Sequence, residues 1–430
     1  MLSNIQLFIT ITFLSFISLL IGIEYPNLSI PFVTLLFCLY CALSFKSNFR
    51  FYFLLYPLLV IIIFPFYKQP FCDLGDGISY FGATRSYLPF YNGTGNVDKI
   101  FELIETINLK ILYIGFIPNI LIPDYLYAEP SESVYYYWQS CLHVIYVSIC
   151  LVLAKKWKVL PEDYLLPLVL FAVISPSFFE IGNAPTRHFM TFFSILLFYT
   201  SINSAIKSIT FSKIIILLIS LILIIVSKIG YLVPVIGYSI YRILSANSIN
   251  KIYKYIMVII IVIITILLLP FFYKLLYAFN ENKLGGAATF SFLVGIPILS
   301  VLSKYIYALL APFPWQEASL FIDTIYGGNW IHFTLHVISS LTGIYFFAII
   351  ILHFKSIMRS NKEIKDLVLF GLIMSSTILV GQTGYHGYLS IFFPFFAPLF
   401  AVRNFKIPIW STILIALLFE FVYSLAILLL

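Results

Sequence analysis

Charged residues are scarce in this chain of 430 residues: Asp, Glu, Lys and Arg make up 10% of it, whereas hydrophobic residues make up 61%. A soluble domain of this length carries roughly 25% charge. No polar stretch exceeds about 40 residues, which excludes a separate water-soluble domain. We therefore expect an all-α polytopic integral membrane protein in which residues 1–430 form a single transmembrane domain.

Several sequence signals are also absent. The first apolar run, Ile5 to Ile23, lacks a basic segment before it and a small-residue cleavage site after it, so we expect a retained helix. The chain has no P-loop, no GxSxG motif and no dinucleotide fingerprint, which argues against the common nucleotide and hydrolase sites. Its five cysteines are an odd number and Cys72 stands alone in a polar segment, so no structural disulfide is expected.

Apolar runs long enough to cross a bilayer as helices recur along the whole chain. At about 20 residues for each span, they predict about 11 to 14 transmembrane helices. The predicted spans lie near residues 4–23, 28–45, 51–67, 133–153, 164–181, 189–206, 212–227, 229–244, 255–273, 331–354, 366–382, 387–402 and 408–429.

Lys and Arg gather in short segments between these runs, which is typical of cytoplasmic loops. Those segments hold 16 of the 25 basic residues: Lys46, Arg50, Lys155, Lys156, Lys158, Lys207, Lys213, Arg242, Lys251, Lys254, Lys355, Arg359, Lys362, Lys365, Arg403 and Lys406. This threading puts the N-terminus in the cytoplasm and predicts a multi-pass membrane protein with two long outer segments, 68–132 and 274–330. Because the net charge of +7 is not gathered in one patch, no nucleic-acid partner is expected.

Arg187 lies near the end of a polar segment, Glu180-Ile-Gly-Asn-Ala-Pro-Thr-Arg-His188, between two apolar runs. A charge at bilayer depth is costly and therefore rare unless it faces a cavity or a partner. A cation, an acid and a histidine at one membrane edge suit an anionic, membrane-bound substrate, so Arg187, Glu180 and His188 are candidate site residues. The alternative is a turn in which Arg187 only anchors the chain at the lipid headgroups.

The first outer segment opens with a second polar motif, Cys72-Asp-Leu-Gly-Asp-Gly-Ile-Ser-Tyr-Phe-Gly-Ala-Thr-Arg85. Asp73 and Asp76 are three residues apart, so they could share a cation or divide acid and base roles, and Arg85 could bind an anion. Two acids alone are a weak metal signal, and we expect no metal ion and no cofactor. The alternative is a solvated loop in which the glycines make the turn.

Two further motifs lie in predicted outward turns. Pro312-Phe-Pro-Trp315 is a rigid aromatic corner that brings Glu317 near the membrane surface, and aromatic faces such as that of Trp315 pack against sugar rings. His386, in Gly381-Gln-Thr-Gly-Tyr-His-Gly-Tyr388, could transfer a proton or contact a phosphate. The alternatives are an interfacial aromatic belt, a re-entrant turn without chemistry and a hydrogen-bonded interfacial histidine.

These features together resemble the Wzy-type O-antigen polymerases and, more broadly, the polytopic GT-C glycosyltransferases that act on polyprenyl-linked sugars. Asp76-Gly-Ile-Ser-Tyr80 resembles the acidic first-loop motif of GT-C enzymes, and Asn183-Ala-Pro-Thr-Arg187 and Pro312-Phe-Pro-Trp315 look like features of bacterial surface-polysaccharide proteins. The resemblance covers the whole chain in architecture. One departure is His386, which stands where some relatives have a basic residue in the last outward turn.

The resemblance implies polymerisation of polyprenyl-pyrophosphate-linked repeat units at the outer leaflet of the inner membrane. Arg187 and Arg85 would stabilise the pyrophosphate, and Asp76 or Glu180 would act as the base. The implied partners are a polyprenyl-linked oligosaccharide, membrane lipid and a chain-length regulator protein. The remaining candidates would contact substrate, and they are Asp73, His188, Trp315, Glu317 and His386.

Two other functions fit the same architecture. One is a GT-C transferase that adds a single sugar from a polyprenyl-phosphate donor, and the sequence does not separate it from a polymerase. The other is a flippase for lipid-linked oligosaccharide. A flippase built from paired halves should show an internal repeat and short outer loops, whereas this chain has no visible repeat and gathers its polar residues in outer segments.

Overall fold

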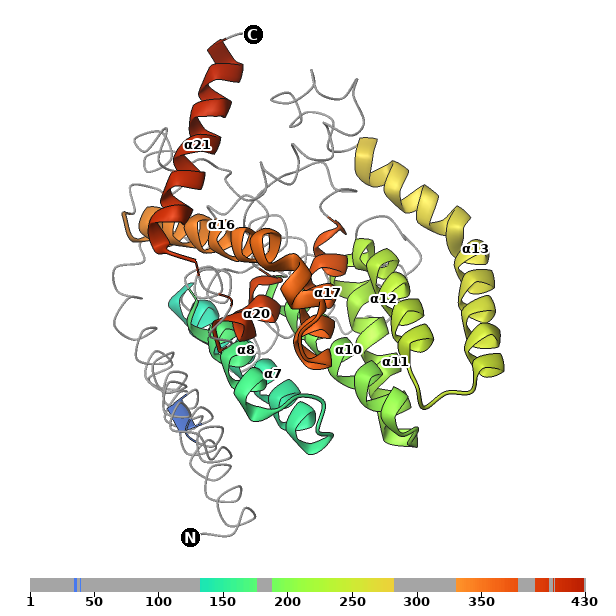
Figure 1. The fold of residues 1–430 in the computed structure, drawn as a ribbon. Coiled ribbons are helices and arrows are strands. Elements are labelled where there is room, and N and C mark those ends of the chain that lie inside the picture. The colour runs from blue at the N-terminus through green and yellow to red at the C-terminus, as the bar shows by residue number, and fades with distance from the viewer. Residues whose placement is uncertain are drawn as a thin grey trace.

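The computed structural model of the chain describes residues 35–36, 39, 132–175, 188–281, 330–377, 391–401, 405 and 407–428. These residues are mainly helical and contain no strand, so the prediction of an all-helical protein is confirmed for this part of the chain (Figure 1). The helices are α7 (Glu132–Lys156), α8 (Glu162–Ile174), α10 (His188–Lys207), α11 (Phe211–Lys228), η4 (Ile229–Tyr231), α12 (Leu232–Ser245), α13 (Lys251–Glu281), α16 (Trp330–Met358), α17 (Lys362–Ser375), α20 (Phe393–Phe396), η8 (Ala397–Ala401) and α21 (Ile409–Leu428).

Proline explains two of the helix boundaries. α8 ends before Ser175, whose backbone is extended at φ −65° and ψ 145°, because a residue that precedes a proline is disfavoured in the helical region. The short 3-10 turn η4 separates α11 from α12, and Pro234 in the first turn of α12 lacks the amide that a continuous helix would need. The predicted break between the spans 212–227 and 229–244 is therefore confirmed.

The predicted span at 387–402 was wrong in one respect. After a turn at residues 391–392, the chain forms the short α-helix α20 and then the 3-10 helix η8, rather than one continuous helix. Pro394 lies in the first turn of α20, and Pro398 removes the amide hydrogen that would extend the α-helical pattern. The segment is nevertheless buried, because residues 391–399 are all covered by the surrounding helices.

The basic connectors meet at one end of the helices, the lower side of Figure 1. Lys207 Nζ donates to the carbonyl oxygen of Lys158 at 2.8 Å, and Ser248 Oγ donates to that of Ile206 at 2.8 Å. Asn361 Nδ2 donates to the Tyr164 hydroxyl at 3.2 Å. These bonds join the segments 155–164, 207–213, 242–254 and 355–366, which we call the basic end.

Lysines at the basic end also donate hydrogen bonds to the last carbonyl oxygens of the helices that end there. The last carbonyls of an α-helix have no partner inside the helix, and its C-terminus carries partial negative charge. Lys213 Nζ donates to the carbonyls of Ser204 and Ser208, at 3.2 and 3.0 Å, at the end of α10. Lys254 Nζ donates to the carbonyl of Leu244 at 3.0 Å, at the end of α12. The basic connectors therefore stabilise the helix ends as well as joining them.

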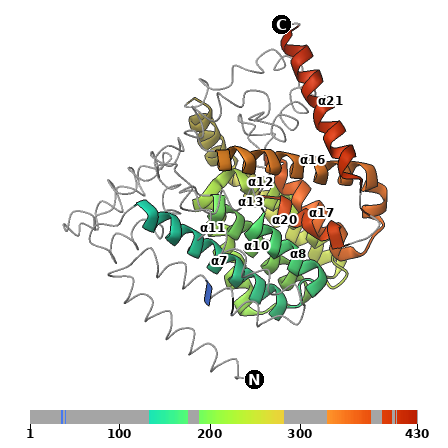
Figure 2. The same cartoon turned by 90° about the vertical axis from the view of Figure 1, so that its left-hand side faces the viewer.

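The helix α10 lies inside the group of helices in both Figures 1 and 2. It packs against α7, α11 and α12, and its side chains from Met190 to Ser204 are all buried. Aromatic rings fill the space between α10, α12, α17 and α20: the Phe370 ring lies 4.6 Å from Tyr238, 4.8 Å from Tyr199 and 4.8 Å from Phe395. This aromatic core is the centre of the described structure.

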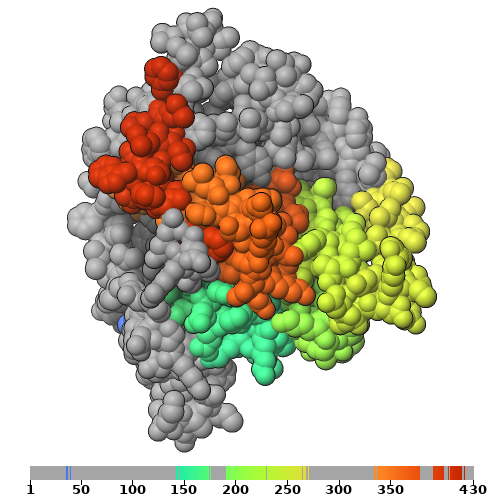
Figure 3. Space-filling model, in the orientation of Figure 1, coloured from blue at the N-terminus to red at the C-terminus, as the bar shows by residue number. Residues whose placement is uncertain are grey.

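Peripheral helices leave long aliphatic faces uncovered. α13 runs along the edge of the molecule in Figure 3, and none of its described side chains is buried. α11 likewise exposes Leu218 and Ile222, at 54% and 61% of their surface. Within the described residues, two helical segments, Phe211–Lys228 and Val337–Met358, are long and apolar enough to cross a membrane.

Candidate functional site

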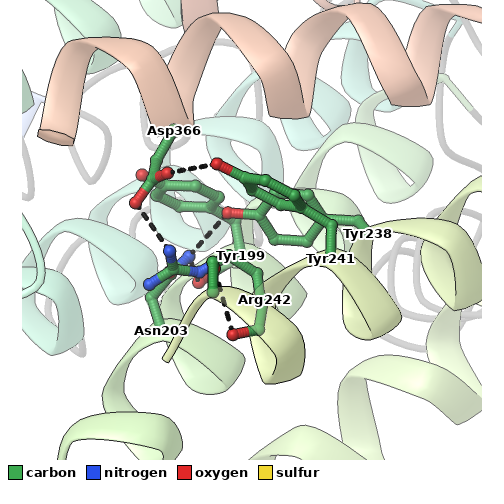
Figure 4. Close-up of polar contacts among 7 residues, drawn as sticks. Tyr199, Asn203, Tyr238, Tyr241, Arg242 and Asp366 are labelled. Carbon is green, nitrogen blue, oxygen red and sulfur yellow. Dashed lines mark hydrogen bonds and ion pairs between the residues drawn. The ribbon is translucent and has the colours of Figure 1, made fainter. Parts of the chain in front are cut away.

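A buried polar cluster lies where α10, α12 and α17 meet, next to the basic end (Figure 4). α10 contributes Tyr199 and Asn203, α12 contributes Tyr238, Tyr241 and Arg242, and α17 contributes Asp366. Residues four apart on a helix share one face, so both Tyr199 and Asn203 on α10, and both Tyr238 and Arg242 on α12, point into the same space.

The strongest contact in this cluster is an ion pair between Arg242 and Asp366. Arg242 Nη1 donates to Asp366 Oδ2 at 2.7 Å, and the two residues are only 4% and 5% exposed. The Tyr241 hydroxyl donates to the other carboxylate oxygen, Oδ1, at 3.0 Å. Since a buried charge is very costly without a partner, this pairing is a condition for α12 and α17 to pack together.

Asn203 links the third helix to the cluster. Its Nδ2 donates to the carbonyl oxygen of Tyr199 at 2.8 Å and to the Tyr238 hydroxyl at 3.2 Å. Arg242 Nε is buried and has no hydrogen-bond partner in the part of the chain that the structure describes. The guanidinium thus binds Asp366 through Nη1, while its Nε–H stays unpaired among the described residues of the cluster.

This cluster ties helices together and offers little for catalysis. The carboxylate of Asp366 already accepts from a guanidinium and a hydroxyl, and its exposure is only 5%. Among the described residues, no three His, Cys, Asp or Glu side chains come close enough to hold a metal ion. We therefore interpret the Arg242–Asp366 pair as an interhelical tie rather than as a reaction centre.

This pair was not predicted from the sequence. Arg242 lies in a segment predicted to be a basic cytoplasmic loop, and no role was predicted for Asp366. A signal was present, because Asp366 is the last charge before a long apolar run, and Arg242 follows the apolar and tyrosine-rich face of α12. An acid that opens one apolar helix and a cation that closes another are candidates for pairing when both helices end at the same side.

Most of the predicted site residues lie outside the described residues. These residues are Asp73, Asp76, Arg85, Glu180, Arg187, Trp315, Glu317 and His386. The two predicted outer segments, 68–132 and 274–330, lie outside them except for Glu132, which starts α7, residues 274–281 at the end of α13, and Trp330, which starts α16. The outer position of these segments and the roles of these residues thus stay predictions.

His188 is the one predicted site residue whose backbone is described. It is the first residue of α10, immediately after Arg187 in the chain. α10 then runs for 20 residues to Lys207 at the basic end. At about 1.5 Å per residue, this distance is about 30 Å, which equals the thickness of the hydrocarbon core of a bilayer. The start of α10 is thus about one membrane thickness from the basic connectors.

Comparisons with known proteins give no assignment. No family model matches this chain, and neither the curated proteins nor the solved structures give a match.

Proposed function

We propose that the chain is a polytopic protein of the bacterial inner membrane. The support comes from the surfaces left uncovered: α11, α13 and α21 expose Ile, Leu, Val and Phe over much of their length, as a lipid-facing surface does. The clustering of the basic connectors at one end agrees with a cytoplasmic position for that end. In this placement the opposite ends of α7 and α10 face the outer leaflet.

We further propose that the protein polymerises polyprenyl-pyrophosphate-linked oligosaccharide repeat units at the outer leaflet. The observation that carries this proposal is the length and direction of α10. Because we place the basic end in the cytoplasm and α10 extends about 30 Å from His188 to that end, we assign the polar segment that precedes His188 in the chain to the outer side of the membrane. Lipid-linked repeat units present their pyrophosphate and sugars on that side.

The proposed reaction transfers a growing glycan from one lipid carrier to the next repeat unit. A hydroxyl oxygen of the acceptor sugar attacks the anomeric carbon of the donor glycan, and the bond from that carbon to the pyrophosphate oxygen breaks. Asp76 or Glu180 takes the hydroxyl proton, and polyprenyl pyrophosphate leaves. Arg187 and Arg85 stabilise the charge that develops on this leaving group, which is the main catalytic task.

The other candidate residues have roles in holding substrate. Trp315 packs against a sugar ring, Glu317 and Asp73 accept hydrogen bonds from sugar hydroxyls, and His188 and His386 contact the phosphates. A chain-length regulator protein is the expected partner for the polymerase. Neither a metal ion nor a cofactor is part of the proposal.

The experiment replaces Arg187 by Ala and by Lys and follows the polysaccharide ladder on a gel. Loss of a charge-assisted contact in a partly dry site costs about 2–4 kcal/mol of transition-state stabilisation, or roughly 30- to 1000-fold in rate. Arg187→Ala should therefore leave unextended lipid-linked glycan. Arg187→Lys should restore only part of the activity, since Lys lacks the planar two-point contact of Arg. Arg50→Ala, in a predicted cytoplasmic loop, is the control with the same change in charge.

The material that accumulates distinguishes the three functions. A complete single repeat unit on the outer leaflet identifies a polymerase, and a repeat unit lacking one sugar identifies a single-sugar transferase. A complete repeat unit retained on the cytoplasmic leaflet identifies a flippase. A ladder of normal length in Arg187→Lys would mean that this arginine only anchors the chain at the headgroups, where lysine serves equally well.

A further inference from the structure

The basic end carries far more positive than negative charge. The segments 155–164, 207–213, 242–254 and 355–366 contain twelve Lys and Arg residues but only four Asp and Glu residues. Some of these cations are used inside the protein. Lys155 pairs with Glu162 at 3.0 Å, Arg242 pairs with Asp366, and the ammonium groups of Lys207, Lys213 and Lys254 bind helix-end carbonyls.

The remaining cations have no such function within the protein. Within the described part of the chain, seven basic side chains make no hydrogen bond and no ion pair, and all but the last are exposed: Lys156, Lys158, Lys251, Lys355, Arg359, Lys362 and Lys365. Lys362 also lies close enough to Lys207 for their like charges to interact. The positive charges on such a surface repel one another unless an anion neutralises them.

Lys158 adds a second observation at this surface. Its backbone adopts φ 51°, and it is the one non-glycine residue with positive φ among the described residues. Glycine or asparagine is favoured in this left-handed conformation at the end of a helix, because other side chains crowd the backbone there. A lysine at this position therefore carries a conformational cost, which an external partner for its ammonium group would offset.

Exposed apolar side chains stand among these cations. Ile209, in the turn between α10 and α11, and Phe211, the first residue of α11, are 75% and 80% exposed. Ile252 and Tyr253, at the start of α13, are 66% and 63% exposed. A surface that meets only water does not gather large apolar residues between lysines. The boundary between headgroups and acyl chains accommodates both, because apolar side chains enter the lipid while ammonium groups reach the phosphates.

We propose that the basic end is a binding surface for anionic phospholipid headgroups. This inference rests on the membrane placement proposed above but not on the polymerase activity. The free cations occur on three separate connectors around the end of the helices, and the apolar residues lie beside them, which fits a ring of lipids better than one soluble acidic partner. Each phosphate diester would bind between neighbouring ammonium groups from different connectors.

The test measures lipid binding to the purified, full-length protein in detergent. Dioleoylphosphatidylglycerol and dioleoylphosphatidylcholine are the probes, and native mass spectrometry gives their dissociation constants. Since one Lys or Arg near an anionic surface contributes about fivefold in affinity, Lys156→Gln combined with Lys158→Gln and Lys362→Gln should weaken phosphatidylglycerol binding at least tenfold. Phosphatidylcholine binding should not change.

Three controls test whether positive charge at the basic end, rather than net charge or the identity of the lysines, binds the lipid. The same three lysines replaced by Arg should retain binding, because Arg keeps the charge. Lys68→Gln combined with Lys99→Gln and Lys110→Gln, in the predicted outer segment, changes the net charge equally and should leave the affinity for phosphatidylglycerol intact. Raising the NaCl concentration to about 0.5 M should weaken binding to the unmodified protein, which tests the electrostatics without any substitution.

Two outcomes would overturn the proposal. One is equal loss of phosphatidylglycerol binding in the two Gln combinations, which would mean a general charge effect. The other is displacement of the lipid by millimolar inorganic phosphate, which would assign the surface to a free anion. Because lipid binding is measured without sugar substrates, a negative result for polymer synthesis in the Arg187 variants leaves the outcome of this test unaffected.

Discussion

The helices α10, with 20 residues, and α13, with 31, are both rich in apolar residues but have opposite positions in the molecule. α10 is buried on every side from Met190 to Ser204, and it carries six buried polar residues: Thr191, Ser194, Thr200, Ser201, Asn203 and Ser204. The part of α13 from Lys251 to Leu267 has no buried side chain among those described, and it is made largely of Ile, Val, Leu and Tyr. The more polar helix is inside and the more apolar helix is outside.

This arrangement is the reverse of what water favours. In a soluble protein the hydrophobic effect would bury α13 and leave the polar faces of α10 at the surface. Three of the six buried polar side chains of α10 bind backbone carbonyls: Ser194 Oγ donates to that of Met190 at 2.6 Å, Ser201 Oγ to that of Phe198 at 3.1 Å and Asn203 Nδ2 to that of Tyr199 at 2.8 Å. The buried hydroxyls of Thr200 and Ser204 have no hydrogen-bond partner among the described residues. Small polar residues allow close packing between membrane helices, so the difference between α10 and α13 supports the membrane placement.

The substitution with the largest expected effect on stability removes a buried charge from the polar interior beside α10. Arg242→Ala leaves Asp366 buried without its cation, and loss of one partner from a buried pair costs about 3–5 kcal/mol of stability. Asp366→Ala should have an effect of similar size. We expect a large fall in the thermal unfolding midpoint of the purified protein in detergent, measured by size-exclusion chromatography after heating.

The matched control is the exposed pair at the same end. Lys155 and Glu162 lie 3.0 Å apart, but their side chains are 36% and 34% exposed, so Lys155→Ala should cost about 0.2–1 kcal/mol. The double variant Arg242→Met with Asp366→Leu removes both buried charges and should recover most of the lost stability. Equal effects of Arg242→Ala and Lys155→Ala would contradict the interpretation of the buried pair as the tie between α12 and α17.

The sequence predicts the helices well and the contacts between them poorly. Hydrophobic run length and intervening basic segments predict α7, α10, α11, α12 and α16 to within a few residues, because both signals are local. The ion pair that joins α12 to α17 spans 124 residues of sequence, so it depends on tertiary packing that no local pattern encodes. The site residues predicted from the loop motifs all stay predictions, including His188, of which only the backbone position at the start of α10 is described.

The substitution with the second-largest expected effect introduces a charge on the exposed face of α13. Ile260 is 49% exposed near the middle of the helix, and Ile252 is 66% exposed at its start beside the basic end. If lipid covers α13, Ile260→Lys places a charge near the bilayer centre and costs about 2.5–3.5 kcal/mol of insertion free energy. Ile252→Lys should cost much less because its ammonium group can reach the headgroups.

The thermal unfolding midpoint of the full-length protein, reconstituted in lipid nanodiscs, measures both variants. If water rather than lipid covered α13, both substitutions would be nearly neutral, because each would replace an exposed apolar side chain by a solvated charge. Equal midpoints for the Ile260→Lys and Ile252→Lys variants would therefore remove α13 from the set of lipid-facing helices and would weaken the comparison with α10.

The substitution with the smallest expected effect on stability adds a methyl group to the interior around α10 and so tests how closely that interior is packed. Gly371 on α17 faces the Phe396 ring of α20, and a Cβ added at Gly371 would lie 2.5 Å from Phe396 Cε1. Real Cβ contacts are not this short, so Gly371→Ala must displace the ring, which overpacks the core and costs roughly 1–3 kcal/mol. The thermal unfolding midpoint should therefore fall.

Gly237 on α12 provides the matched control for this substitution. A Cβ added at Gly237 has no other atom within 4 Å, and alanine is the better helix former by about 1 kcal/mol in a helix interior. Gly237→Ala should therefore leave the midpoint unchanged or raise it. If Gly371→Ala were as harmless as Gly237→Ala, the α17–α20 contact would have enough freedom to accept a methyl group. The interior next to α10 would then be loosely packed, and the buried pair of Arg242 and Asp366 would have to hold α17 in place without support from close aromatic packing.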